Sequence, residues 1–169
     1  MALIRLNNQS ISSVTALPSG IDTGKVLQYK YSRAESQFDT SSPTPSEIDS
    51  NLRVTITPTS ASNKILVRLN LAWSDINSGS RSTIVAFYRQ IDGGTTSNMG
   101  SLDSNSSSMF YNWIGARYQK PLMYTYIDYS HNTTSEIVYK FFAMTDSGAT
   151  VRLGASDRYS FGEAIEIAD

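Results

Sequence analysis

Residue types that commonly carry out catalysis are sparse in this 169-residue sequence, which contains one histidine and no cysteine. The histidine, His131, falls in a polar turn between two segments rich in apolar residues. A hydrolytic triad needs a base and a second group that orients it, and no such motif surrounds this single base. We therefore expect His131 to be solvated rather than catalytic. The absence of cysteine excludes disulfide frameworks and thiolate metal sites.

Acidic residues offer no better catalytic arrangement. Glu163 and Glu166 lie three positions apart in a predicted strand. Their side chains therefore leave opposite faces and cannot form the carboxylate pair of a glycosidase. Residues 75–79 and 103–106 alternate oxygen-bearing side chains, but neither stretch has the acidic residue that closes a calcium loop. Asx-type turns explain both stretches better, and we expect no enzymatic activity, no metal and no cofactor.

Binding chemistry is better represented, by three aromatic residues close to a serine-rich loop: Tyr111, Trp113 and Tyr118. Tyrosine and tryptophan combine an apolar ring with a polar group, and here asparagine and serine lie beside them. This combination is suited to saccharide recognition. The alternative is that these rings fill one end of a hydrophobic core.

The elements that must position these residues are strands. The clearest stretch is residues 52–74, in which two apolar-alternating runs flank the polar connection 58–63. Alternation with a period of two is typical of half-buried strands. The proline at position 58 ends the first run, because proline cannot donate to a strand ladder. The two strands either pair as a hairpin or cross between two sheets.

The remaining chain repeats this pattern, with turn signals between predicted strands at residues 25–33, 83–91, 95–99, 122–129, 135–144, 150–153 and 161–167. In the last of these, Ile165 and Ile167 are predicted to face inward and Glu166 outward. The connection 34–50 is predicted to be polar, with one helical turn opened by Pro45. Eight or more strands predict an all-β fold, an antiparallel β-sandwich that is jelly-roll-like.

The domain organisation is predicted to be an N-terminal arm, residues 1–22, followed by one β-sandwich knob, residues 23–169. The arm carries short apolar pieces and is a candidate anchor to a partner, through Ile4, Leu6, Ile11, Val14 and Leu17. The alternative is an edge strand or a loosely packed arm. The net charge of −1 gives no excess of basic residues for binding nucleic acid. The sequence shows neither a signal peptide nor a membrane span, so we expect synthesis in a cytoplasm without membrane insertion.

Two predicted strands are apolar on both faces, around residues 84–88 and 138–142. Apolar surface that remains after a core is filled often forms an interface between subunits. The candidate interface residues are Phe87, Val138 and Phe142. The alternative is that the connections 34–50 and 100–118 cover the second face of these strands.

Several blocks of the sequence resemble proteins of tailed-phage fibres and appendages. Residues 54–67, VTITPTSASNKILV, resemble the block TITPTSASSKILV of that family, and residues 89–95, RQIDGGT, resemble the arginine, isoleucine and Gly-Thr turn that follows it. The ending AIEIA, residues 164–168, is similar to AMEIA. Residues 4–18 are similar to the start of many marine phage virion proteins.

This resemblance implies a virion structural protein with a C-terminal β-sandwich knob, forming a homotrimer and contacting other phage virion proteins. Two roles remain open. The first is a tail fibre or appendage subunit that attaches to the host surface, with the aromatic cluster contacting host surface glycan. The second is a capsid decoration or head-fibre protein with no receptor role.

Overall fold

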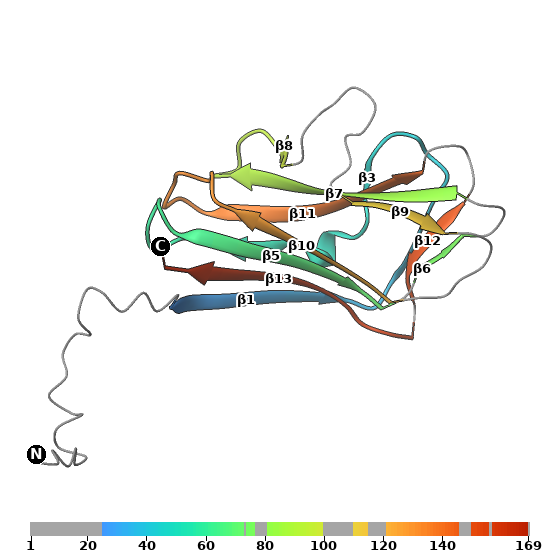
Figure 1. Ribbon diagram of the computed structural model, residues 1–169, viewed down its shortest axis with the longest axis horizontal. Coiled ribbons are helices and arrows are strands. Elements are labelled where there is room, and N and C mark those ends of the chain that lie inside the picture. Colours follow the sequence, from blue (N-terminus) through green and yellow to red (C-terminus); the bar gives the residue numbers. More distant parts are fainter. Residues whose placement is uncertain are drawn as a thin grey trace, which may run out of the picture.

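The computed structural model describes residues 25–72, 74–76, 81–99, 110–114, 121–145, 150–155 and 157–168, with the backbone alone for residues 74–76, 81–82 and 110–114. Antiparallel sheets face each other across one core (Figure 1). The first sheet has the order β1 (Val26–Ala34), β13 (Ser160–Ile167), β5 (Lys64–Leu71), β10 (Leu122–Asp128). The second has the order β3 (Ser46–Glu47), β11 (Ile137–Thr145), β7 (Arg81–Ile91), β8 (Ser97–Asn98), with β4 (Val54–Ile56) on β11 and β9 (Phe110–Ile114) on β7.

A small third sheet prolongs the second one, with the order β2 (Gln37–Thr40), β12 (Val151–Gly154), β6 (Ser74–Ile76). In the sequence, β2 is next to β3, β12 is next to β11 and β6 is next to β7. The order β2-β12-β6 therefore repeats the order β3-β11-β7 of the second sheet. Counted this way, the chain alternates between the two sheets, and its first and last strands, β1 and β13, lie side by side. This is the order of a double-sheet jelly roll, which confirms the predicted fold class.

The connection at residues 58–63 crosses between the sheets and does not close a hairpin. β4 pairs with β11 in the second sheet, whereas β5 lies between β13 and β10 in the first. The sequence left both alternatives open, because alternating runs specify strands but not their partners.

The core lies between the sheets and follows the predicted alternation. Alternate residues of β5 are fully buried, namely Ile65, Val67, Leu69 and Leu71. From the second sheet, Phe87 packs edge-on against Phe141, with ring centroids 5.0 Å apart. Phe87 is therefore a core residue of one chain, and its prediction as an interface residue is wrong, because its ring has no surface for a partner. Val138 and Phe142 lie on the opposite face of β11 and are half-buried. The ring centroids of Phe142 and Tyr88 are 4.2 Å apart.

Three further expectations need correction. In β13 it is Glu166 that faces inward, while Ile165 and Ile167 are half-buried on the outer face. The connection 34–50 contains β2 and β3, and the helical turn is a 3-10 helix at Ser50–Leu52, later than predicted. Its cap is Asp49, whose side chain accepts a hydrogen bond from the backbone N–H of Asn51 at 2.7 Å.

Some predicted features lie outside the described residues. These are the arm at residues 1–22 with its candidate anchors Ile4, Leu6, Ile11, Val14 and Leu17, together with Tyr118 and the side chains of Tyr111 and Trp113. The backbone of Tyr111 and Trp113 belongs to β9.

The two ends of the described sandwich lie together. The backbone N–H of Ala168 donates to the carbonyl of Lys25 at 2.9 Å, and Val26 opposes Ile167 in the ladder between β1 and β13. Both ends therefore leave the sandwich at one corner (Figure 1).

Gly162 of β13 packs closely against the 3-10 helix and against Phe141 of the second sheet, and it provides a test of the packing. A Cβ at this position would lie 2.4 Å from the carbonyl oxygen of Leu52 and 2.8 Å from Cε2 of Phe141. We expect Gly162→Ala to lower the free energy of unfolding by about 1–3 kcal/mol, because the added methyl overpacks the core. Urea denaturation would measure the change.

Gly93→Asn is the matched control. Gly93 has a φ of +67° and no atom within 4 Å of a built Cβ, and asparagine tolerates this left-handed conformation better than most residues. We expect a smaller loss of stability than for Gly162→Ala, because only the strain of the left-handed backbone is added. A Gly162→Ala protein as stable as the wild type would contradict the described contact between the sheets.

Candidate functional site

Two buried carboxylates occupy one end of the sandwich. Glu166 in β13 and Asp128 in β10 both oppose Ile65 of β5, so the three residues form one row across the inner face of the first sheet. Both acidic side chains are 0% exposed. A buried carboxylate is costly unless it is paired or hydrogen-bonded, and each of these two has its own set of partners.

Glu166 accepts hydrogen bonds from three residues in two separate segments of the chain, β1 and the connection 58–63. Its Oε2 accepts from Nε2 of Gln28 at 2.5 Å. Its Oε1 accepts from the backbone N–H of Thr59 at 2.7 Å, from Oγ1 of Thr59 at 2.8 Å and from Nδ2 of Asn63 at 2.6 Å. Burial alone would raise the pKa of Glu166, but these hydrogen bonds outweigh it and lower the pKa to about 2. The side chain is thus an anion that ties the crossing connection 58–63 to β1 and β13.

Asp128 is paired with the other sheet. Nη1 of Arg89 in β7 donates to both carboxylate oxygens, at 2.8 Å and 2.9 Å. The hydroxyl of Tyr139 in β11 donates to Oδ2 at 2.9 Å, and the backbone N–H of Ser130 donates to Oδ1 at 3.1 Å. Burial, and then the negative charge of Asp128, raise the pKa of the Tyr139 hydroxyl above its ordinary value. The cluster joins the first sheet to the second by charge and hydrogen bonds.

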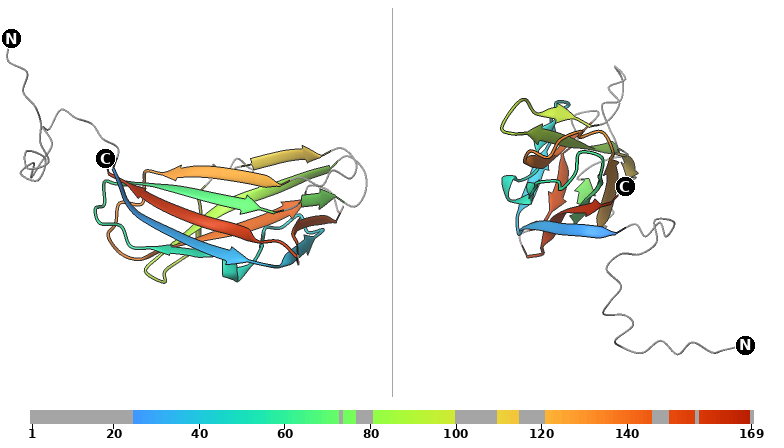
Figure 2. Two further views of the ribbon diagram at one scale, coloured as in Figure 1. Left: turned by 90° about the horizontal axis from the view of Figure 1, so that it is seen from below. Right: turned by 90° about the vertical axis from the view of Figure 1, so that its left-hand side faces the viewer.

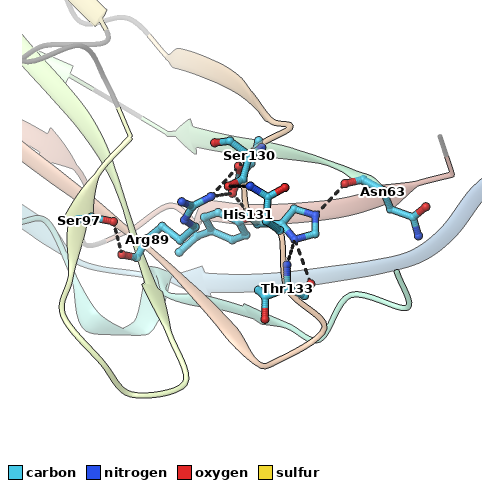
Figure 3. Close-up of polar contacts among 9 residues, drawn as sticks. Asn63, Arg89, Ser97, Ser130, His131 and Thr133 are labelled. Atoms are coloured by element: carbon cyan, nitrogen blue, oxygen red, sulfur yellow. Dashed lines mark hydrogen bonds and ion pairs between the residues drawn. The ribbon is translucent and has the colours of Figure 1, made fainter. Parts of the chain in front are cut away.

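His131 lies between these two networks and is buried, at 3% exposure (Figure 3). Its Nε2 is 2.7 Å from the carbonyl oxygen of Asn63, and its Nδ1 is 3.1 Å from that of Thr133. The expectation that this histidine is solvated is therefore wrong. Both ring nitrogens are engaged with backbone groups of neighbouring turns, so the ring fixes these turns in place.

The chemistry of this end of the sandwich is structural. Glu166, Asp128 and His131 are closed to solvent and hydrogen-bonded within the chain, which leaves no exposed acid, base or nucleophile among them. Among the described residues, no cluster of three or more acidic or histidine side chains is placed to hold a metal ion. Within the described residues, no helix is long and apolar enough to cross a membrane.

The outer face of the first sheet carries exposed aromatic and aliphatic side chains. The strand registers arrange it in three rows of four residues: Tyr29, Ile165, Leu66 and Ile127; Tyr31, Glu163, Arg68 and Thr125; Arg33, Phe161, Asn70 and Met123. Sequence reasoning missed this surface. The signal that could have found it is in β1, where Gln28 and Ser32 take the inner face and leave the tyrosines outside.

The three predicted interface residues do not share one face of the second sheet. Phe87 is inside the core, whereas Val138 and Phe142 lie on the outer face of the second sheet, opposite Thr55 and Glu47 respectively. Glu163 and Glu166 leave opposite faces of β13, as their spacing predicts.

Comparison with known proteins gives a distant likeness. No protein-family model matches the sequence, and the comparison with curated proteins finds no match. Among solved structures, the chain is similar to one described as the structure of infectious bursal disease virus Gx strain, with a TM-score of 0.46 and 9% identity. The likeness covers 90% of this chain and 36% of that chain, so the chain spans little more than a third of the protein it matches. A likeness this distant says nothing about what the chain binds or assembles with.

Removing the charge of Glu166 tests the first network. Glu166→Gln places an amide donor among the donors of Gln28, Thr59 and Asn63. We expect the free energy of unfolding at pH 7 to fall by about 2–3 kcal/mol, because buried donors lose a charged acceptor. The exposed Glu136 supplies the control, and Glu136→Gln should change stability by less than about 0.5 kcal/mol.

The same variant has a defined pH dependence. Because the pKa of Glu166 is about 2 in the folded chain and ordinarily 4.5, the ionised side chain adds stability above pH 4.5. That stability is lost as the pH falls through about 2. The difference in unfolding free energy between wild type and Glu166→Gln should therefore be constant from pH 7 to pH 5 and shrink toward pH 2. A difference that stays constant down to pH 2 would contradict the assignment.

The second network is tested by Asp128→Asn, which leaves the partly buried guanidinium of Arg89 without its counter-charge. We expect a loss on the order of 3 kcal/mol in unfolding free energy. Asp39→Asn is the matched control, because Asp39 pairs with Arg152 at 3.1 Å on the surface and exposed pairs contribute less than about 1 kcal/mol. Equal losses of unfolding free energy in the two variants would show that the buried pair stabilises the fold no more than the exposed pair does.

Proposed function

We propose that the chain is a structural protein of a bacteriophage virion, a fibre or appendage subunit that takes part in attachment to the host surface. The observation that supports this most is spatial. Three sequence blocks that resemble phage fibre proteins, residues 54–67, 89–95 and 164–168, meet at one end of the sandwich.

The contacts between the blocks run through the two buried networks. Glu166 of the last block accepts hydrogen bonds from Thr59 and Asn63 of the first block. Asn63 contacts His131, and Asp128, on the same turn as His131, binds Arg89 of the middle block. The blocks therefore form a single structural unit, which makes a chance resemblance of three separate segments a poorer explanation.

The fold supports a role in an assembly. A jelly roll in which Glu166, Asp128 and His131 are closed to solvent, and which has a broad apolar outer face, is suited to binding rather than to turnover. In this proposal the residues before β1, 1–22, anchor the knob to the particle. They leave the sandwich at the corner where Lys25 lies beside Ala168.

A head-surface decoration is the second candidate, since it requires only an anchor and a knob. The two roles differ in the use of the aromatic cluster. In the attachment role, Tyr111 and Trp113 of β9 contact host surface glycan, and their replacement by alanine lowers adsorption to host cells. In the decoration role, adsorption is unchanged by the same substitutions.

Incorporation into particles tests the proposal. We expect the chain to be present in purified virions of the phage that encodes it, and cryo-EM of those virions to place it on the tail. Deletion of residues 1–22 should leave a cooperatively unfolding sandwich that is no longer incorporated. The cooperative melt is the control, because it separates a lost anchor from a lost fold.

Two outcomes would contradict this proposal. Purified virions without the chain would exclude a virion role altogether. Incorporation of the truncated chain at the wild-type level would exclude residues 1–22 as the anchor.

A further inference from the structure

We propose that the outer face of the first sheet is the surface through which copies of this chain associate. Figure 2 (left) shows β1, β13, β5 and β10 side by side along this face. The inference rests on the described side chains alone and is independent of the particle assignment.

Exposed apolar side chains are concentrated on this sheet. In the described part of the chain, every large apolar side chain that is exposed lies on β1, β10 or β13 or flanks one of them: Val26, Leu27, Tyr29, Tyr31, Met123, Ile127, Tyr129, Tyr159 and Phe161. Tyr31 at 64% exposure and Met123 at 67% come from opposite edges of the sheet. One row, Tyr29, Ile165, Leu66 and Ile127, is apolar from the edge strand β1 to the edge strand β10. An exposed apolar surface of this kind is typical of contact with another protein.

The three charged side chains in these rows, Glu163, Arg68 and Arg33, each have a contact within the chain. Oε1 of Glu163 accepts a hydrogen bond from the hydroxyl of Tyr29 at 2.6 Å, and its Oε2 lies 3.9 Å from Nη1 of Arg68. The guanidinium of Arg33 lies 4.7 Å from the ring centroid of Tyr159. The net charge of the three rows is only +1, from two arginines and one glutamate, which argues against a strongly charged partner.

The dimensions of the face fit a stable contact. Four strands about 4.8 Å apart and about 8 residues long give a face of about 19 Å by about 26 Å. Side-chain relief increases the accessible area beyond this flat projection of roughly 500 Å², toward the roughly 800 Å² that each partner of a stable complex buries. A shallow hollow of about 340 Å³ beside Met123, Tyr159 and Phe161 adds shape to one end of the face.

A second copy of the chain is the occupant that these properties favour. A largely apolar face of low net charge is best complemented by a surface with the same properties, and each further copy supplies one. Closed cyclic symmetry then buries the face in every copy without leaving an open end that would polymerise. The subunit contact predicted from the sequence lay on the other sheet, at Val138 and Phe142. Both side chains are half-buried within the chain, and the ring of Phe142 packs against that of Tyr88.

Sedimentation equilibrium of the full-length chain, from about 1 to about 100 μM, tests the proposal. We expect the wild type to be a closed oligomer. Tyr31→Asp and, separately, Met123→Asp should each raise the dissociation constant at least about 30-fold, because a charge is then buried at the contact. Both side chains are highly exposed, so each variant should still unfold cooperatively, with its melting temperature lowered only by the lost association.

Thr55→Asp is the matched control. Thr55 is also an exposed strand residue, but it lies opposite Val138 on the second sheet. Its substitution should leave the dissociation constant unchanged. A monomer mass across the whole concentration range would overturn the proposal. So would an oligomer that Thr55→Asp dissociates while Tyr31→Asp and Met123→Asp do not, because the contact would then lie on the second sheet.

Discussion

The carboxylate of Glu166 holds the point at which the chain passes from one sheet to the other. A connection between sheets exposes backbone and side-chain donors that no ladder satisfies, and here the donors of Thr59 and Asn63 converge on one buried anion. Gln28 adds a donor from the edge strand β1. Because these groups come from three distant parts of the sequence, the network forms only when β1, β5 and β13 are already together. It therefore stabilises the assembled topology and no single local element.

The same carboxylate also fixes which way β13 faces. Both faces of this strand are partly apolar, with Ala164 inside and Ile165 and Ile167 outside, so burial of apolar surface distinguishes poorly between the two orientations. A slip of one residue would exchange the faces. It would also move Glu166 away from its four hydrogen bonds, and the position of one charged group thereby determines the register that the apolar residues leave ambiguous.

The fold was predictable from the sequence where one face of a strand is wholly buried. β5 alternates cleanly because Ile65, Val67 and Leu69 face the core, and β7 and β11 lie within a few residues of their predicted positions. The short strands β2 and β3 were not predictable, because they pair through the backbone in a segment rich in polar residues.

The candidate site was far less predictable than the fold. A glutamate flanked by isoleucines indicates an outward-facing charge, and a histidine in a polar turn indicates solvent exposure. In both cases the partners that make burial favourable lie far away in the sequence, more than 60 residues for His131 and Asn63. The outer face of the first sheet was missed for a related reason. Alternating aromatic residues such as Tyr29 and Tyr31 suggest the core face of a strand. The hydrogen bonds of Gln28 and Ser32 instead place these two polar residues on the inner face and the tyrosines outside.

The common corner at which both ends leave the sandwich has a mechanical consequence. Lys25 and Ala168 are joined by a hydrogen bond, and antiparallel β1 and β13 run away from that corner together. Tension applied between the two ends would therefore load the ladder one rung at a time, beginning with that bond, because rungs of an antiparallel pair lie across the strands. Strands pulled from opposite ends resist by shearing all rungs at once, whereas this pair would unzip at low force. A load transmitted from residues 1–24 into the sandwich would thus be resisted best if β1 were also held on its exposed face.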